Sequence, residues 1–119
     1  MDIEELRVFC LSLKGVTEGF PFDETTLVFK VMGKMFCLAG LENNPISFNV
    51  KCDPEKAIEL REEFAGVIPG YHMNKTHWNT VIFDGSFSDQ HARMWIKDSY
   101  DLVAASLSKQ LKLELHKLT

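Results

Sequence analysis

The most constraining stretch of the sequence is a strand-like alternation that leads directly into a helix start. From residue 46 to residue 51 apolar and polar side chains alternate, with Ile46, Phe48 and Val50 set against Ser47, Asn49 and Lys51. A period of two predicts an antiparallel strand with one buried face and one polar face. Asp53-Pro54-Glu55 then supplies a capping residue, a proline suited to the first helical position and an acid near the positive helix end.

Helix and strand signals elsewhere extend this pattern. We expect one helix from the Asp2 cap to about Gly15, and the longest helix from the Ser88 cap to about Ala105. Strands are predicted over 25–31, 35–41, 46–51, 67–73 and 77–83, while 16–22 is typical of an edge strand or a loop. A final segment places Leu107, Leu111, Leu115 and Leu118 at helical spacing. The predicted fold is α+β in two layers, with helices covering one face of an antiparallel sheet.

Length and composition indicate one compact unit. The 119 residues suit a single domain, 1–119, and 45% hydrophobic with 25% charged residues is ordinary for a globular protein. No window approaches the ~18 apolar residues of a membrane span. The acidic N-terminus also lacks the basic start of a secretory signal. We therefore expect a cytoplasmic protein that does not enter a membrane.

No catalytic or cofactor motif is visible, so we expect a non-enzymatic protein with no catalytic residues and no cofactor. Cys10, Cys37 and Cys52 form no closely spaced pair, which favours free thiols over disulfides or a zinc knuckle. Cys52 precedes a helix start, where the helix dipole can lower a thiol pKa, although a packed thiol is the simpler interpretation. His72 and His77 have no ligand partner at metal spacing, so no metal site is predicted.

Charge is unevenly spread along the chain. The net charge of −4 argues against a strong electrostatic grip on nucleic acid. Residues 64–83, however, contain no Asp or Glu and do contain His72, Lys75 and His77. The C-terminal segment from Ser106 is also basic, with three lysines against Glu114.

Several stretches resemble the YjbR/MmcQ family of small bacterial proteins. They are Gly15–Glu18 with Phe20–Asp23 and Thr26–Val31, then Lys51–Glu55, then Pro69–Lys75 with His77–Val81, and finally Ser99–Val103. The third is the most specific, and together they cover nearly the whole chain. The resemblance implies a two-layer α+β fold grouped with secretion-chaperone-like and frataxin-like (CyaY-like) architectures. It also implies a DNA-binding domain of "double wing" arrangement without an established enzymatic activity.

The stretch from Tyr71 to Thr80 supplies most of a predicted DNA-binding surface. Lys75 can neutralise a phosphate, and Tyr71 and Trp78 offer faces for base stacking. Asn74 and Asn79 can pair with adenine in a major groove, and Lys51 adds charge nearby. The complete set of candidate residues is Lys51, Tyr71, His72, Asn74, Lys75, His77, Trp78 and Asn79.

Structural roles compete with each of these assignments. Trp78 alternates with Thr80 and Ile82 and suits a core position, Asn74 suits a turn, and the histidines can bond buried carbonyls. Weak, salt-dependent DNA binding is the first functional hypothesis because the resemblance favours it. Composition alone favours a protein-partner module or a homodimer, with the leucine-rich C-terminal segment as a docking surface. The third hypothesis is a small-ligand pocket lined by Tyr71, His72 and Trp78.

Overall fold

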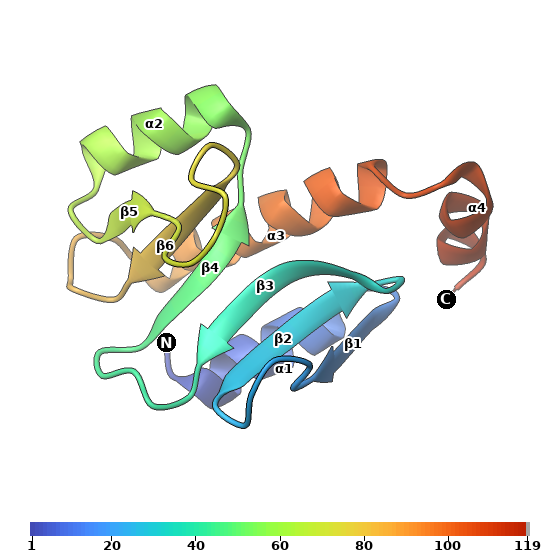
Figure 1. Cartoon of the computed structure of the whole chain (residues 1–119), viewed down its shortest axis with the longest axis horizontal. Helices are drawn as coiled ribbons and strands as arrows, with labels where there is room; N and C mark the ends of the chain where they lie inside the picture. Colours follow the sequence, from blue (N-terminus) through green and yellow to red (C-terminus); the bar gives the residue numbers. More distant parts are fainter. Residues whose placement is uncertain (119) are drawn as a thin grey trace.

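The computed structural model describes residues 1–118, which form four helices and one six-stranded antiparallel sheet (Figure 1). The helices are α1 (Ile3–Ser12), α2 (Pro54–Glu63), α3 (Asp89–Ala105) and α4 (Lys109–Lys117). The strands are β1 (Val16–Gly19), β2 (Thr26–Val31), β3 (Lys34–Gly40), β4 (Ser47–Lys51), β5 (Val67–Pro69) and β6 (Trp78–Ile82). Their order in the sheet is β1-β2-β3-β4-β6-β5. The predicted α+β class and element order are confirmed.

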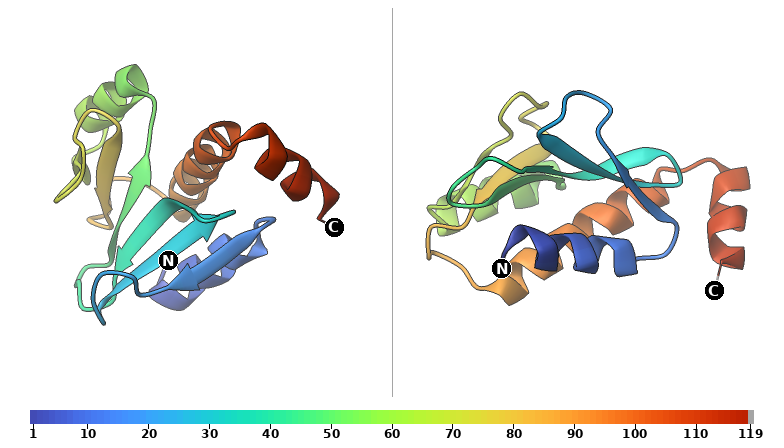
Figure 2. Two further views of the ribbon diagram at one scale, coloured as in Figure 1. Left: turned by 45° about the vertical axis from the view of Figure 1, so that its right-hand side comes forward. Right: turned by 90° about the horizontal axis from the view of Figure 1, so that it is seen from below.

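Helices lie on one side of the sheet only. The right panel of Figure 2 shows α1 and α3 on one side, while the loops before β2 and before β6 rise from the other. We call the side with the helices the covered face and the opposite side the open face. The open face is formed by alternate strand residues that include Val28 of β2, Leu38 of β3, Asn49 of β4 and Thr80 of β6. Among residues 1–118 no helix combines the length and the apolar character that crossing a membrane requires.

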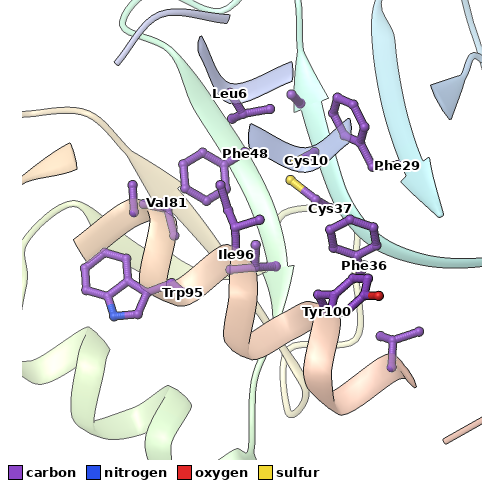
Figure 3. Close-up of a cluster of buried hydrophobic side chains, with 14 of the residues drawn as sticks. Leu6, Cys10, Phe29, Phe36, Cys37, Phe48, Val81, Trp95, Ile96 and Tyr100 are labelled. Atoms are coloured by element: carbon purple, nitrogen blue, oxygen red, sulfur yellow. The ribbon is translucent and has the colours of Figure 1, made fainter. Parts of the chain in front are cut away.

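The hydrophobic core lies between the covered face and the helices (Figure 3). Phe29, Phe36 and Phe48 project from three neighbouring strands and are at most 1% exposed. Ile96 of α3 is also fully buried, and Tyr100 of the same helix meets Phe36 edge-on at 5.4 Å between ring centroids. The buried stripe predicted for this helix is confirmed at all five positions, which are Ala92, Trp95, Ile96, Tyr100 and Val103.

Helix starts follow the capping residues that the sequence offers. The side chains of Asp2, Asp53 and Ser88 each accept a hydrogen bond from the backbone N–H three residues further on. At the other end of α2, Phe64 closes the helix and Gly66 lies beyond it. Gly66 directly precedes β5, and its carbonyl accepts a hydrogen bond from the backbone N–H of Ile82.

The last helix is held against the turn between α1 and β1. A side chain at Gly15, whose φ is +74°, would strike Leu115 of α4. The Lys14 ammonium also donates to the His116 carbonyl at 3.1 Å. Leu111 and Leu115 are half-buried, whereas Leu113 is 51% and Leu118 43% exposed. The predicted helical segment is confirmed for Leu111 and Leu115, whereas Leu107 lies before α4 and Leu118 caps its end. The proposed role of these leucines in docking a partner stays a prediction.

A buried serine joins β3 and β4 where their pairing breaks. In the pairing of β2 with β3, Phe29 lies opposite Cys37 and Lys30 opposite Met35, so Phe36 is the extra residue of a bulge in β3. There the Ser99 hydroxyl accepts a hydrogen bond from the Lys51 backbone N–H at 2.8 Å and donates one to the Phe36 carbonyl at 2.6 Å. Ser99 is fully buried, so α3 supplies the link that the two strands do not make directly.

The structure decides the phase of β6. The core alternative for Trp78, Thr80 and Ile82 is wrong, because these residues lie on the open face, while Asn79 and Val81 face the covered side and are each 1% exposed. A shift of one residue exchanges the two faces of a strand, so periodicity alone decides this poorly in a strand as mixed as WNTVI. Both β5 and β6 are also shorter than predicted, because residues 70–77 leave the sheet as a loop.

Candidate binding cleft on the open face

A cleft of about 500 Å³ lies on the open face between two loops. We call residues 20–25, before β2, the first loop and residues 70–77, before β6, the second loop. The floor is formed by β2, β3, β4 and β6. The residues that line the cleft are Phe22, Asp23, Thr25, Thr26, Met35, Leu38, Gly40, Glu42, Asn43, Ser47, Phe48, Asn49, Tyr71, His72, Met73 and Thr80. Its volume lies within the range of small-molecule sites, roughly 300–1,000 Å³.

The second loop is anchored from beneath by Arg61 of α2. Its Nε donates to the Asn79 side-chain oxygen at 2.6 Å, and a terminal nitrogen donates to the carbonyls of Lys75 and Trp78. The Asn79 amide in turn donates to the Ala57 carbonyl at 3.3 Å. A side chain of the covered face therefore fixes the base of a loop that walls the open face.

Two aromatic rings of the second loop stand at the cleft wall. The ring centroids of Tyr71 and His72 are 4.0 Å apart, and Tyr71 is 66% exposed. His72 has a φ of 60°, a left-handed conformation that histidine adopts more readily than most residues. The Tyr71 backbone N–H donates to the Thr80 hydroxyl at 2.8 Å, and that hydroxyl donates to the Asn49 side chain at 2.5 Å. Wall and floor are thus joined by one chain of hydrogen bonds.

The first loop is organised by the carboxylate of Asp23. It accepts hydrogen bonds from the backbone N–H groups of Thr25 at 2.9 Å and Thr26 at 2.7 Å. These bonds favour the ionised form and lower the pKa of Asp23 below its ordinary value. The turn leaves Phe22 63% exposed on the cleft wall, across from the second loop.

Opposite charges lie at the two ends of the open face. Lys30 is paired with Met35 across β2 and β3, and Lys51 is paired with Trp78 across β4 and β6. Both lysines lie just outside the cleft floor, near the ends of β2 and β4. Asp23 and Glu42 line the cleft at the other end, where β2 begins and β3 finishes. The open face therefore has one basic and one acidic end.

The structure separates the eight predicted site residues. Tyr71 and His72 line the cleft, while Lys51 and Trp78 share the open face beyond its floor. The remaining four, Asn79, Asn74, Lys75 and His77, lie outside the cleft lining and make contacts of their own.

Asn79 was predicted to contact DNA, but its side chain is buried under α2 and bonded to Arg61. It cannot reach a ligand without unfolding that contact. The Asn74 side chain accepts a hydrogen bond from the Thr76 backbone N–H, as the turn interpretation predicts. The Lys75 ammonium donates to the Gly70 carbonyl at 3.2 Å within its own loop. His77 is exposed, and its carbonyl accepts from the Cys52 backbone N–H at 2.7 Å.

Sequence reasoning missed half of the cleft. Phe22 and Asp23 belong to a stretch that carried the family resemblance, yet no binding role was predicted for them. Asn49 and Thr80 lie on neighbouring strands. Asn49 was assigned only to the polar face of its strand, and Thr80 either to the end of the predicted DNA-binding stretch or to the core. The polar alternation of residues 46–51 was the available signal, since it already indicated which strand face meets solvent.

Cys52 lacks the activated thiol that a helix start can provide. It is half-buried, and desolvation raises its pKa, with the nearby Asp53 and Asp98 charges acting in the same direction. That shift is opposite to the one a cysteine nucleophile needs. Across residues 1–118, His, Cys, Asp and Glu side chains also form no group of three placed to hold a metal ion.

Comparisons with known proteins place the chain in one family. The YjbR family model matches residues 11–102. The uncharacterised protein YbdF of Escherichia coli O157:H7 is 35% identical over 107 residues, covering 90% of this chain and 88% of the relative. The uncharacterised protein YjbR of Escherichia coli K12 is 32% identical over 100 residues, covering 84% and 85%.

Two solved structures have the same fold as this chain. The crystal structure of Deinococcus radiodurans protein DR2400 superposes with a TM-score of 0.88 at 38% identity, covering 96% of this chain and 87% of that one. A Pseudomonas syringae protein shares the fold with a TM-score of 0.72 at 24% identity, covering 86% of this chain and 98% of that one.

Proposed function

The chain belongs to the YjbR family, and from that premise we propose that it is a non-enzymatic module that binds nucleic acid on its open face. One observation carries the proposal, namely exposed aromatic rings and lysines on the same face. Of the described strand residues that point to this side, none is acidic, and two are Lys30 and Lys51. The net charge of −4 predicts that binding is weak.

Each group on this face has a defined task in the proposal. Tyr71 and Phe22 present ring faces to unpaired bases, and stacking of this kind contributes about 1–3 kcal/mol per base. Lys30 and Lys51 contact phosphates outside the cleft. Since the cleft itself is lined by Asp23 and Glu42, a phosphate is repelled from its interior and the backbone stays at the lysine end.

The test is a titration of a labelled single strand and the matching duplex, followed by fluorescence anisotropy at ~50 and ~200 mM salt, a range over which phosphate contacts weaken steeply. We expect affinity for the single strand to fall as salt rises. Affinity that does not change with salt, or the absence of binding at the lower salt concentration, contradicts the proposal.

Two double variants locate the surface. Lys30→Gln with Lys51→Gln removes two charges from the open face, and Lys109→Gln with Lys112→Gln removes two from the exposed side of α4. Each phosphate contact to a single strand contributes about 0.7 to the log–log salt slope, so the first pair is expected to reduce the slope by roughly 1.4. The second pair is expected to leave it unchanged. If only the α4 pair reduces the salt slope, the phosphate contacts lie on α4 and the open face is not the binding surface.

A small planar ligand is the second candidate function. The observation that favours it is the cleft itself, which has a volume typical of small-molecule sites while both open-face lysines lie outside its lining. A thermal-shift screen of nucleotides and uncharged aromatic metabolites tests it, because a ligand that binds only the folded state raises Tm. A metabolite that raises Tm, together with no binding of single-stranded or duplex DNA, favours this candidate.

A further inference from the structure

The charge polarity of the open face follows the strands themselves. On β2 the chain runs from Thr26, beside the acidic rim, to Lys30. On β4 it runs in the same sense from Ser47 to Lys51, and on β3 it returns from Met35 to Gly40. Four residue steps along a strand separate the two ends by about 13 Å. A ligand that fits this face is therefore anionic at one end and offers hydrogen-bond donors at the other.

The acidic end provides one carboxylate that is available to a ligand. Both oxygens of Asp23 are engaged by Thr26, one by its backbone N–H and the other by its hydroxyl. Glu42 also lines the cleft and is exposed, and within residues 1–118 no hydrogen bond or ion pair occupies its carboxylate. A carboxylate accepts hydrogen bonds and donates none, so it selects groups that carry N–H donors.

Between the two ends the cleft is bounded by flat apolar surfaces. Phe22 projects from the first loop and Tyr71 from the second, and each is more than 60% exposed, at 63% and 66%. Leu38 and Met35 form apolar floor, and the Asn49–Thr80 pair adds polar groups beside it. An aromatic ring that enters from the lysine end can contact Phe22 and Tyr71 at the cleft walls and Glu42 at the acidic end.

We propose that the cleft receives one unpaired nucleobase with an exocyclic amino group, which donates to Glu42 while the attached phosphate stays between Lys30 and Lys51. This inference rests on the proposed nucleic-acid function and adds strand and base selectivity to it. Duplex DNA is excluded because its bases are stacked and paired. Thymine is disfavoured because it has no exocyclic amino group and offers a carboxylate only its ring N3–H, whereas carboxylates read cytosine through its amino group.

The deciding experiment compares oligo-dC and oligo-dT of one length by anisotropy at low salt. We expect the full-length protein to bind oligo-dC about three- to tenfold more tightly, the effect of a single net hydrogen bond. Glu42→Gln is expected to bring this ratio close to one. Glu59→Gln on the exposed side of α2 is the matched control and is expected to preserve the ratio.

The outcomes separate this inference from the function on which it rests. If single strands bind in a salt-dependent way but dC and dT bind equally, or if Glu42→Gln retains the ratio, the base preference is wrong and nucleic-acid binding stands. If no strand binds, both are wrong. Thermal shift with dCMP, dTMP and inorganic phosphate tests whether the cleft binds a free nucleotide in place of a nucleic-acid strand. A larger rise in Tm with dCMP than with dTMP or phosphate indicates a free nucleotide. Equal shifts with dCMP and phosphate show that only the phosphate is recognised.

Discussion

The two faces of the sheet bury side chains for different purposes. On the covered face, Phe29, Phe36 and Phe48 interlock with α1 and α3 and leave almost no surface exposed. On the open face, Val28 and Leu38 are also nearly buried, at 1% and 6% exposure, but their neighbours Asn49 and Thr80 form a polar pair. The first face holds the main buried hydrophobic cluster, whereas the second keeps hydrogen-bonding groups within reach of a ligand. This difference predicts that mutations on the two faces act on different properties.

Adjacent residues of β3 provide the sharpest test of that contrast. Phe36 is fully buried on the covered face, and Met35 is half-buried on the open face. Phe36→Ala is expected to lower the free energy of unfolding by about 3–5 kcal/mol, since both packing and transfer from water are lost. Met35→Ala is expected to cost less than half as much. Urea unfolding followed by circular dichroism measures both, and equal losses contradict the division between the faces.

The serine bridge is expected to give the next largest effect. Ser99→Ala leaves the Lys51 N–H and the Phe36 carbonyl without a partner, at a cost of about 1–3 kcal/mol. Amide exchange at Lys51 is expected to accelerate more than exchange at the centre of β2. Ser106→Ala, at the exposed end of the same helix, serves as the control. Unchanged exchange at Lys51 shows that the strands do not depend on the bridge.

Arg61 connects the two faces and is expected to have a smaller effect on stability. Arg61→Met keeps the length of the side chain but removes its bonds to Asn79 and the second loop, for an expected loss of about 1–2 kcal/mol. The second loop should then become more sensitive to proteolysis, and any ligand affinity of the cleft should fall. Lys56→Met on the same helix controls for the loss of charge. Normal protease resistance of the loop argues that Arg61 only fills space.

The smallest expected effect is a pH dependence located in the first loop. Because the pKa of Asp23 is lowered in the folded state, its contribution is complete above the unfolded pKa and disappears as pH falls through the folded pKa. The difference in Tm between the natural protein and Asp23→Ala is therefore expected to be constant near neutral pH and to shrink in acid. If the difference in Tm persists at the lowest pH at which the protein folds, the effect of Asp23→Ala comes from packing and not from the ionised carboxylate.

Local signals in the sequence determined much of the fold. The Asp2, Asp53 and Ser88 caps and the alternation of residues 46–51 predicted the helix starts and the orientation of β4, because these depend on neighbouring residues and on backbone geometry. The family resemblance and the order of elements were also confirmed. Among the candidate site residues, Tyr71 and His72 were placed on a cleft wall.

Only the tertiary structure decided how the site is assembled. Asn79 is buried because Arg61 and the Ala57 carbonyl satisfy the hydrogen bonds of its amide. Both partners lie on α2, so the sequence pattern of β6 could not predict them. The cleft pairs Phe22 with Tyr71 because a six-stranded sheet brings two distant loops to the same face. Periodicity reports which residues prefer burial, but contacts between distant segments determine which polar side chains are buried with partners and which remain exposed to meet a ligand.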